Sequence, residues 1–187
     1  MRIKSYVEKT FLHSHNHKYP LHHDEKKVSS EGQQVNGYSF PDENNFWIIA
    51  PESDDKIEEL QGTQVKTGDV IRLEHASTAG YLLTHDVASP LTMSNMEMTV
   101  WKKNNTEKNR HNETLWVLKK VSGPSNVETK RSVFQLRHVV QKVFLNNHKK
   151  TLPEWGFGQK EINGIRAGEG KETHWFFDTV KEIKGKQ

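Results

Sequence analysis

The chain has 187 residues, a length that suits one domain or at most two small ones. Its formal charge of +3, from 27 basic and 24 acidic residues, is too small to indicate nucleic-acid binding. No apolar run approaches the ~20 residues of a membrane-spanning helix, and the absence of cysteine excludes disulfides and thiolate metal sites. We therefore expect a domain that binds no nucleic acid and does not itself insert into a membrane.

Three copies of a short motif, aromatic–Leu–x–polar–His, recur along the chain at 11–15, 81–85 and 144–148. Each copy is followed by a proline five residues after the histidine, then by an acidic or amide residue before an apolar one, and finally by a tryptophan. Four landmarks in the same order three times indicate a threefold internal repeat. We place the repeats at approximately 1–50, 66–119 and 131–180 of a single domain, 1–187.

Each repeat is predicted to contain four short β-strands. The first, at 2–6, 71–75 and 134–138, alternates apolar and polar residues with the period of two that a half-buried strand requires. The second is the motif itself, which ends at the proline because proline lacks a backbone N–H. The third and fourth contain the acidic or amide landmark and the tryptophan. Twelve such strands favour an all-β fold, a closed barrel with pseudo-threefold symmetry called a β-trefoil.

Tryptophan closes every repeat, and we expect Trp47, Trp116 and Trp175 to form the hydrophobic core. The polar segments between the strands differ in length and are rich in Lys, Glu, Asn, Ser and Gly. Such segments are typical of surface loops, which we expect at 22–32, 51–67, 102–113 and 121–130.

Two N-x-[ST] sequons, beginning at Asn104 and Asn112, are predicted N-glycosylation sites. Both fall in one of the polar segments, where a glycosyltransferase can reach an acceptor. They are a modest indication of the secretory pathway, because such triplets also arise by chance.

The histidine that ends each motif is the obvious functional candidate, but we favour a structural role for it. A residue present in every repeat is best explained by something that every repeat needs, such as satisfying buried backbone groups where strands turn. His13, His15 and His17 alternate along one strand and share a face, as metal ligands can. Because neither His13 nor His17 has a counterpart in the other repeats, we predict no metal site.

Catalytic chemistry finds little support in the sequence. The paired carboxylates at 24–25 and 42–43 lie in polar stretches without the apolar cover that would raise a pKa. The chain has no nucleophile elbow, no phosphate-binding loop and no thiol. We therefore predict no catalytic residue and no cofactor.

Polar residues recur beside the aromatic ones in a pattern that suits a binding site. Short hydroxyl, amide and carboxylate side chains next to flat apolar faces are what a sugar or an extended peptide requires. The segment 155–157 (Trp-Gly-Phe) lies outside the repeat pattern. Its aromatic residues could equally be exposed for stacking or buried as core filling. The predicted ligand-binding residues are Leu12, His13, Ser14, His15, Gln34, Asn44, Leu83, Thr84, His85, Glu97, Asn147, His148 and Glu161.

These motifs resemble a known module. Leu12–His15, Gln33–Val35 and Asn44–Trp47 resemble the MIR domain, a β-trefoil shared by protein O-mannosyltransferases and intracellular calcium-release channels. Leu82–Pro90 and Leu152–Gly156 are similar to the second and third repeats of the mannosyltransferases, with the nearest resemblance to the branch thought to act as a homodimer on membrane-anchored acceptors. The third repeat departs from the pattern, with two asparagines where His-Ser is usual.

The resemblance implies a parent enzyme of the endoplasmic reticulum, a multi-pass membrane protein that transfers mannose from dolichyl phosphate mannose to Ser/Thr of proteins. Its MIR domain lies in a luminal loop, whereas the family's catalytic acidic pair lies in another loop that this chain lacks. We therefore expect a non-catalytic module that binds glycan or a Ser/Thr-rich acceptor protein and contacts the remainder of the enzyme. The alternative is a structural or dimerisation scaffold with no ligand of its own. An autonomous hydrolase or transferase is a third possibility, for which we expect no turnover by the fragment.

Overall fold

The computed structural model describes residues 1–102 and 110–179, and the described chain is all-β, as the sequence predicts. The strands predicted at 2–6, 71–75 and 134–138 are present, at Arg2–Ser5, Val70–His75 and Val133–His138. The strands are β1 (Arg2–Ser5), β2 (Phe11–Lys18), β3 (His22–His23), β4 (Lys26–Lys27), β5 (Gln33–Tyr38), β6 (Trp47–Pro51), β7 (Val70–His75), β8 (Gly80–Ala88), β9 (Met96–Lys102), β10 (Trp116–Ser122), β11 (Val133–His138), β12 (Phe144–Thr151), β13 (Lys160–Ile165) and β14 (Trp175–Thr179).

Helical structure in the described part of the chain is confined to short turns. None of these is long and apolar enough to cross a membrane. The α-helix α1 (Ile57–Leu60) has a single turn, which fits the polar sequence around it. The 3-10 helices are η1 (Glu43–Asn45), η2 (Asp54–Lys56), η3 (His111–Thr114), η4 (Glu154–Gly156) and η5 (Lys171–Thr173).

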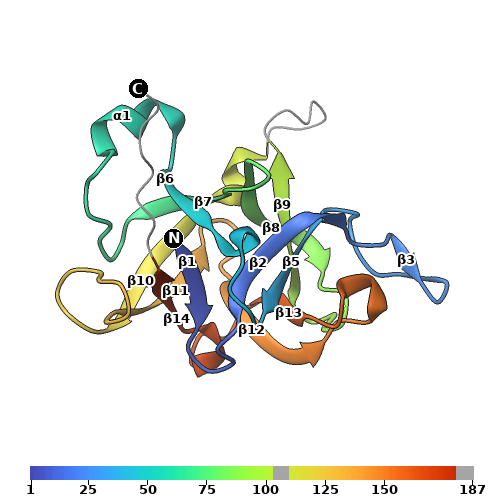
Figure 1. Cartoon of the computed structure of the whole chain (residues 1–187). Helices are drawn as coiled ribbons and strands as arrows, with labels where there is room; N and C mark the ends of the chain where they lie inside the picture. The colour runs from blue at the N-terminus through green and yellow to red at the C-terminus, as the bar shows by residue number, and fades with distance from the viewer. Residues whose placement is uncertain (103–109, 180–187) are drawn as a thin grey trace.

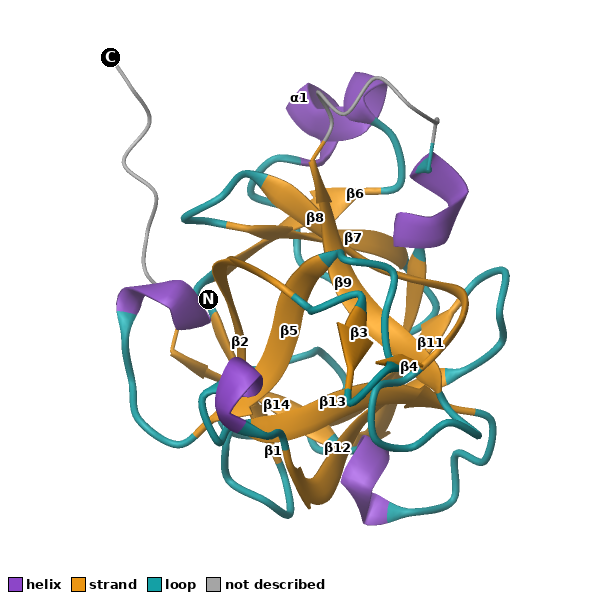
Figure 2. Ribbon diagram, turned by 90° about the vertical axis from the view of Figure 1, so that its right-hand side faces the viewer, coloured by secondary structure: helices purple, strands orange, loops and turns teal. Residues whose placement is uncertain are grey.

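The strands form a barrel that closes on itself (Figure 1). Neighbours run in the order β10, β11, β14, β1, β2, β5, β13, β9, β8 and β7, and β10 pairs again with β7. Three of these strands, β5, β9 and β13, also pair with one another (Figure 2). Closure leaves few free strand edges and brings segments far apart in sequence into contact.

One polar segment expected to be a loop contains a small hairpin. β3 and β4 pair with each other and project from the barrel (Figure 1). Asp24 and Glu25 connect them with φ of 48° and 63°, the left-handed backbone that a two-residue hairpin turn requires. The sequence hides this turn because glycine, its usual residue, is absent from it.

The three motif strands share one irregularity. β2 pairs with β5, β8 with β9, and β12 with β13, and in each pair the register shifts after the polar residue of the motif, at Ser14, Thr84 and Asn147. The next residue in each strand is the motif histidine. A register break lets a strand bend and re-aims its side chains. The histidines therefore lie where each strand leaves its regular ladder.

The hydrophobic core contains one tryptophan from each repeat. Trp47, Trp116 and Trp175 have no exposed surface and belong to one buried cluster. Each indole Nε1–H donates to the carbonyl oxygen of the motif leucine in its own repeat. This bond gives the buried N–H group a hydrogen-bond partner. The three bonds are Trp47 to Leu12 (2.9 Å), Trp116 to Leu82 (3.1 Å) and Trp175 to Leu145 (2.9 Å).

Candidate functional site

Six rings of the first and third repeats lie in a continuous row, buried at His13 and exposed at both ends, which we call the aromatic–histidine row. The residues come from β2, from the last residue of β5 and the segment directly after it, and from the loop after η4. Successive ring centroids are 4.9–5.8 Å apart, within the range of direct ring contacts. In spatial order the row consists of Phe40, Tyr38, His13, His15, His17 and Phe157.

Phe157, at one end of the row, has an unusual backbone conformation. Its φ of 57° and ψ of 26° lie in the left-handed region, which costs a bulky residue about 1–2 kcal/mol. Despite this strain the ring is 54% exposed, and it contacts His15 and His17 at centroid distances of 5.1 Å. Trp155, two residues earlier, is half-buried against Tyr19. The exposed aromatic of this segment is therefore Phe157, whereas Trp155 packs against Tyr19.

The imidazoles at the centre of the row are held neutral. Burial lowers the pKa of His15 to about 4, with help from the neighbouring His13 and His17 rings. Burial also lowers the pKa of His13, although a hydrogen bond from its Nδ1–H to Asn45 Oδ1, 2.7 Å long, opposes the effect. At neutral pH the centre of the row thus offers two uncharged imidazoles, His13 and His15, with flat faces and hydrogen-bonding nitrogens.

The motif histidine of the second repeat is engaged on both ring nitrogens. Arg110 Nη2 lies 2.6 Å from His85 Nδ1, and Glu97 Oε2 lies 2.9 Å from His85 Nε2. Because a guanidinium only donates, Nδ1 accepts and Nε2 carries the proton that it donates to Glu97. Glu97 is fully buried and also accepts from the backbone N–H of Ser30 (3.1 Å) and from its hydroxyl. His85 has no free polar atom for a ligand.

Glu161 of the third repeat is a buried carboxylate surrounded by donors. Its Oε1 accepts from Ser89 Oγ (2.5 Å) and from the backbone N–H groups of Leu91 (2.8 Å) and Thr92 (3.2 Å). Its Oε2 accepts from Thr92 Oγ1 (2.6 Å) and Asn163 Nδ2 (3.1 Å). Five bonds saturate the acceptor capacity of the group and fix the loop that follows β8.

Gln34, Glu97 and Glu161 occupy equivalent positions and link the repeats in a cycle. Gln34 Nε2 donates to the carbonyl of Trp155 in the third repeat (2.9 Å). Glu97 binds Ser30 in the first repeat, and Glu161 binds the loop of the second. Each residue thus holds the loop that follows the proline in another repeat. All three were predicted to bind ligand, and their side chains make these buried internal bonds instead of facing solvent.

Most of the other predicted ligand-binding residues also lie inside the protein. Leu12 and Leu83 have no exposed surface. The Ser14 and Thr84 hydroxyls donate to the backbone carbonyls of Gln34 (2.7 Å) and Glu97 (2.8 Å). The remaining three are the buried Asn147, which donates to Thr10 Oγ1, and the half-buried Asn44 and His148.

The side chains that could ligate a metal, and the paired carboxylates noted in the sequence, lie as follows in the part of the chain that the structure describes. Within residues 1–102 and 110–179, no three histidine, aspartate or glutamate side chains converge in a way that could hold a metal ion. Asp42 caps η1 by accepting from the backbone N–H of Asn44 at 2.7 Å. Asp24 and Glu25 are exposed at the tip of the β3–β4 hairpin.

Comparison with known proteins identifies the module. The family model of the MIR domain matches residues 10–177. The chain belongs to the MIR domain family. Curated relatives of this MIR domain include dolichyl-phosphate-mannose–protein mannosyltransferase 4 of Schizosaccharomyces pombe (40% identical over 97% of the chain) and of Saccharomyces cerevisiae (37% over 97%). Protein O-mannosyl-transferase 1 of Danio rerio is 35% identical over 94% of the chain. The chain spans about a quarter of each relative (24%, 24% and 25%).

Solved structures resemble the MIR domain equally clearly. The SDF2-like protein from Arabidopsis thaliana superposes with a TM-score of 0.80 and 26% identity, over 94% of this chain and 89% of that one. The S. cerevisiae protein O-mannosyltransferase Pmt1–Pmt2 complex bound to the sugar donor gives the same TM-score and identity, over 95% of this chain and 24% of that one. A β-trefoil named BEL, 11% identical, shares the fold with a TM-score of 0.58 over 96% of this chain and 91% of that one.

Within this MIR domain, reasoning from the sequence found only part of the row. It selected His13 and His15, and it noted the aromatic segment that contains Phe157. Tyr38, the last residue of β5, and Phe40, two residues further on, were missed, although their rings lie in contact. Of the two predicted sequons, Asn104 lies outside the described residues, and Asn112 is exposed on η3.

Proposed function

We propose that the chain is a non-catalytic luminal domain of an endoplasmic-reticulum protein O-mannosyltransferase, and that it binds glycan through the aromatic–histidine row. The mannosyltransferase relatives and the Pmt1–Pmt2 complex support the enzyme context. The three equivalent Trp-to-Leu bonds and the BEL neighbour support a β-trefoil with pseudo-threefold symmetry. The parent would transfer mannose from dolichyl phosphate mannose to proteins, as the names of the relatives indicate.

The observation that carries glycan binding is the exposed ring of Phe157, held by a strained backbone beside the neutral imidazole of His15. A pyranose stacks one C–H face on an aromatic ring and needs hydrogen-bonding groups at its edge. Strain persists only where the surroundings enforce it, and it concentrates at functional sites. Only the first repeat has a histidine at the position of His13, because Leu83 and Asn146 take its place in the other two.

Titration of the ¹⁵N-labelled chain with methyl α-mannoside and an α-mannobiose tests the proposal by NMR. We expect saturable shifts at His15 and Phe157 with a dissociation constant in the millimolar range, which tethering within a parent enzyme would make effective. Phe157→Gly should abolish these shifts while changing the free energy of unfolding by less than about 1 kcal/mol, because glycine relieves the backbone strain. His148→Ala, at the matched motif position of the third repeat, should bind like the wild type.

Absence of shifts with the wild-type chain, or unchanged binding by Phe157→Gly, would overturn the glycan site.

The second candidate function, a scaffold that stabilises or dimerises the enzyme, is favoured by the cyclic bonds of Gln34, Glu97 and Glu161. It predicts that a full-length enzyme carrying Phe157→Gly keeps its assembly and its activity. Binding by the row predicts instead that assembly is kept and that modification of the acceptor protein falls.

A further inference from the structure

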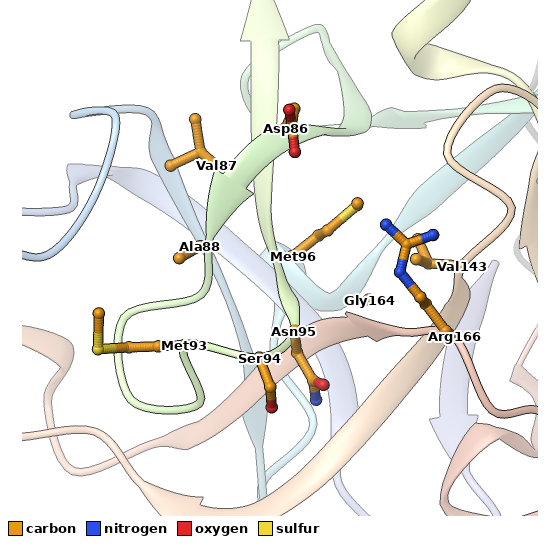
Figure 3. A pocket seen from close by; sticks show the side chains of 10 residues that line it. All are labelled: Asp86, Val87, Ala88, Met93, Ser94, Asn95, Met96, Val143, Gly164 and Arg166. Atoms are coloured by element: carbon orange, nitrogen blue, oxygen red, sulfur yellow. The ribbon is translucent and has the colours of Figure 1, made fainter.

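A second surface feature, separate from the row, lies between the second and third repeats. It is a hollow of about 200 Å³, bordered by β8, the start of β9 and the end of β13 (Figure 3). Pockets for drug-sized molecules occupy roughly 300–1,000 Å³, so this hollow is too small for such a ligand. It matches the size of a single large side chain.

The floor of the hollow is apolar and its sides carry opposite charges. Val143 has no exposed surface and Met96 is 8% exposed, whereas Met93 at the rim is 76% exposed. Asp86 projects from β8 and Arg166 from the residue directly after β13, and both side chains are exposed (Figure 3). Among the interactions of the described residues, neither of these two charges takes part in an ion pair.

The hollow is held open by its surroundings. The loop that presents Met93 is fixed at Ser89, Leu91 and Thr92 by the buried carboxylate of Glu161. On the opposite side, a Cβ at Gly164 would lie 2.7 Å from Val143 Cγ2, so only glycine lets the backbone of β13 approach this closely. The cavity is therefore formed before a ligand binds, so binding carries no free-energy cost for ordering it.

The lining decides which class of ligand fits. It contains no aromatic ring, so it lacks the stacking face that a sugar uses. Two methionines provide a flexible apolar surface of the kind found in peptide-binding grooves. A carboxylate and a guanidinium on separate sides complement a ligand that carries a cation and an anion on either side of an apolar group.

We infer that this hollow binds an extended polypeptide segment of a partner protein, with an apolar side chain on the apolar floor, a basic residue at Asp86 and an acidic residue at Arg166. The inference does not depend on glycan binding by the row. In a mannosyltransferase, such a site would hold the acceptor chain itself, away from the sugars already attached to it.

Peptides with defined charge order provide the test. The ¹³C-methionine methyl signals of Met93 and Met96 report on the hollow, and that of Met1 serves as an internal control. We expect one of two pentapeptides, Lys-Gly-Leu-Gly-Glu or Glu-Gly-Leu-Gly-Lys, to shift the first two signals more strongly. Replacing its leucine by serine should weaken binding about 10- to 100-fold, as expected for loss of a buried leucine.

Reversal of the charges provides the sharpest variant. The double substitution Asp86→Lys, Arg166→Glu should make the chain prefer the peptide of opposite order, with each exposed pair contributing about a two- to fivefold effect. Glu169→Lys, an exposed charge absent from the lining of the hollow, should leave the preference unchanged. Both substituted sites are exposed, so folding is expected to survive. Binding independent of leucine, or an order preference that survives the reversal, would overturn the inference. Concentration-dependent self-association abolished by Met93→Ala would also overturn it, in favour of a second copy of the chain.

Discussion

Replacing Glu161 by glutamine separates an architectural role for this residue from the ligand-binding role that the sequence predicts. Glutamine has the same shape but only one acceptor oxygen, whereas all five groups around the Glu161 carboxylate can donate. The Gln amide nitrogen would face the Asn163 amide nitrogen. The side-chain amide of Asn163 cannot flip without losing the bonds that its Oδ1 accepts from Asn95 and Asn146.

The cost follows from these contacts. Three bonds to Oε1 change from charge-assisted to neutral, a loss of about 0.5–1 kcal/mol each, and one donor left unsatisfied adds about 1–3 kcal/mol. Easier desolvation of the neutral amide offsets part of this loss. We expect Glu161→Gln to lower the free energy of unfolding by about 2–4 kcal/mol, and Tm by roughly 5–15 °C.

Urea unfolding followed by tryptophan fluorescence measures this change, with Glu169→Gln as the exposed control that should stay within about 0.5 kcal/mol of wild type. A Glu161→Gln midpoint equal to that of the wild type would refute the stabilising role of the link between repeats. If the stable variant also lost binding of mannoside or peptide, the ligand-binding role predicted from sequence would be restored.

Three further predictions concern stability. Burial lowers the pKa of His138 to about 4, from 6.5 in the unfolded chain, so the unfolded state takes up the proton first as the pH falls. His138 should therefore contribute about 2 kcal/mol to the fall in the free energy of unfolding between pH 7 and pH 5, and His138→Gln should remove this contribution and flatten that part of the urea-midpoint profile. Trp116→Phe removes the bond to Leu82 and some core volume, and should cost about 2–3 kcal/mol in urea unfolding. Gly164→Ala should lower Tm, at a cost of about 1–3 kcal/mol, because its Cβ collides with the buried Val143; an unchanged Tm would show that the backbone gives way.

One motif serves different purposes in the three repeats. His15 contacts other rings in the aromatic–histidine row, whereas His85 is enclosed by Arg110 and Glu97. His148 is half-buried, and its Nδ1 accepts from the backbone N–H of Lys150 at 3.1 Å. The shared part of the motif, its leucine carbonyl and the tryptophan that binds it, is structural in every repeat. The differences arise from the loops that each histidine meets.

The sequence by itself determined the repeat, the all-β class and the positions of the buried tryptophans. These features depend on local periodicity and on spacing within one repeat, and both are readable along the chain. Apolar residues repeated at matched positions need a shared interior, because each short sheet alone could not bury its apolar face. The resemblance of the motifs to the MIR domain rested on the same spacing.

Only the tertiary structure decided which polar residues face solvent. Gln34 hydrogen bonds to Trp155, 121 residues away in the sequence, and Glu97 to Ser30, 67 residues away. The ring of Phe157 contacts that of His15, near the other end of the chain. No sequence spacing encodes these contacts, because closure of the barrel places the loop of one repeat against a strand of another. A carboxylate looks the same in the sequence whether it faces a ligand or five internal donors. The partners that barrel closure supplies are what distinguish the two.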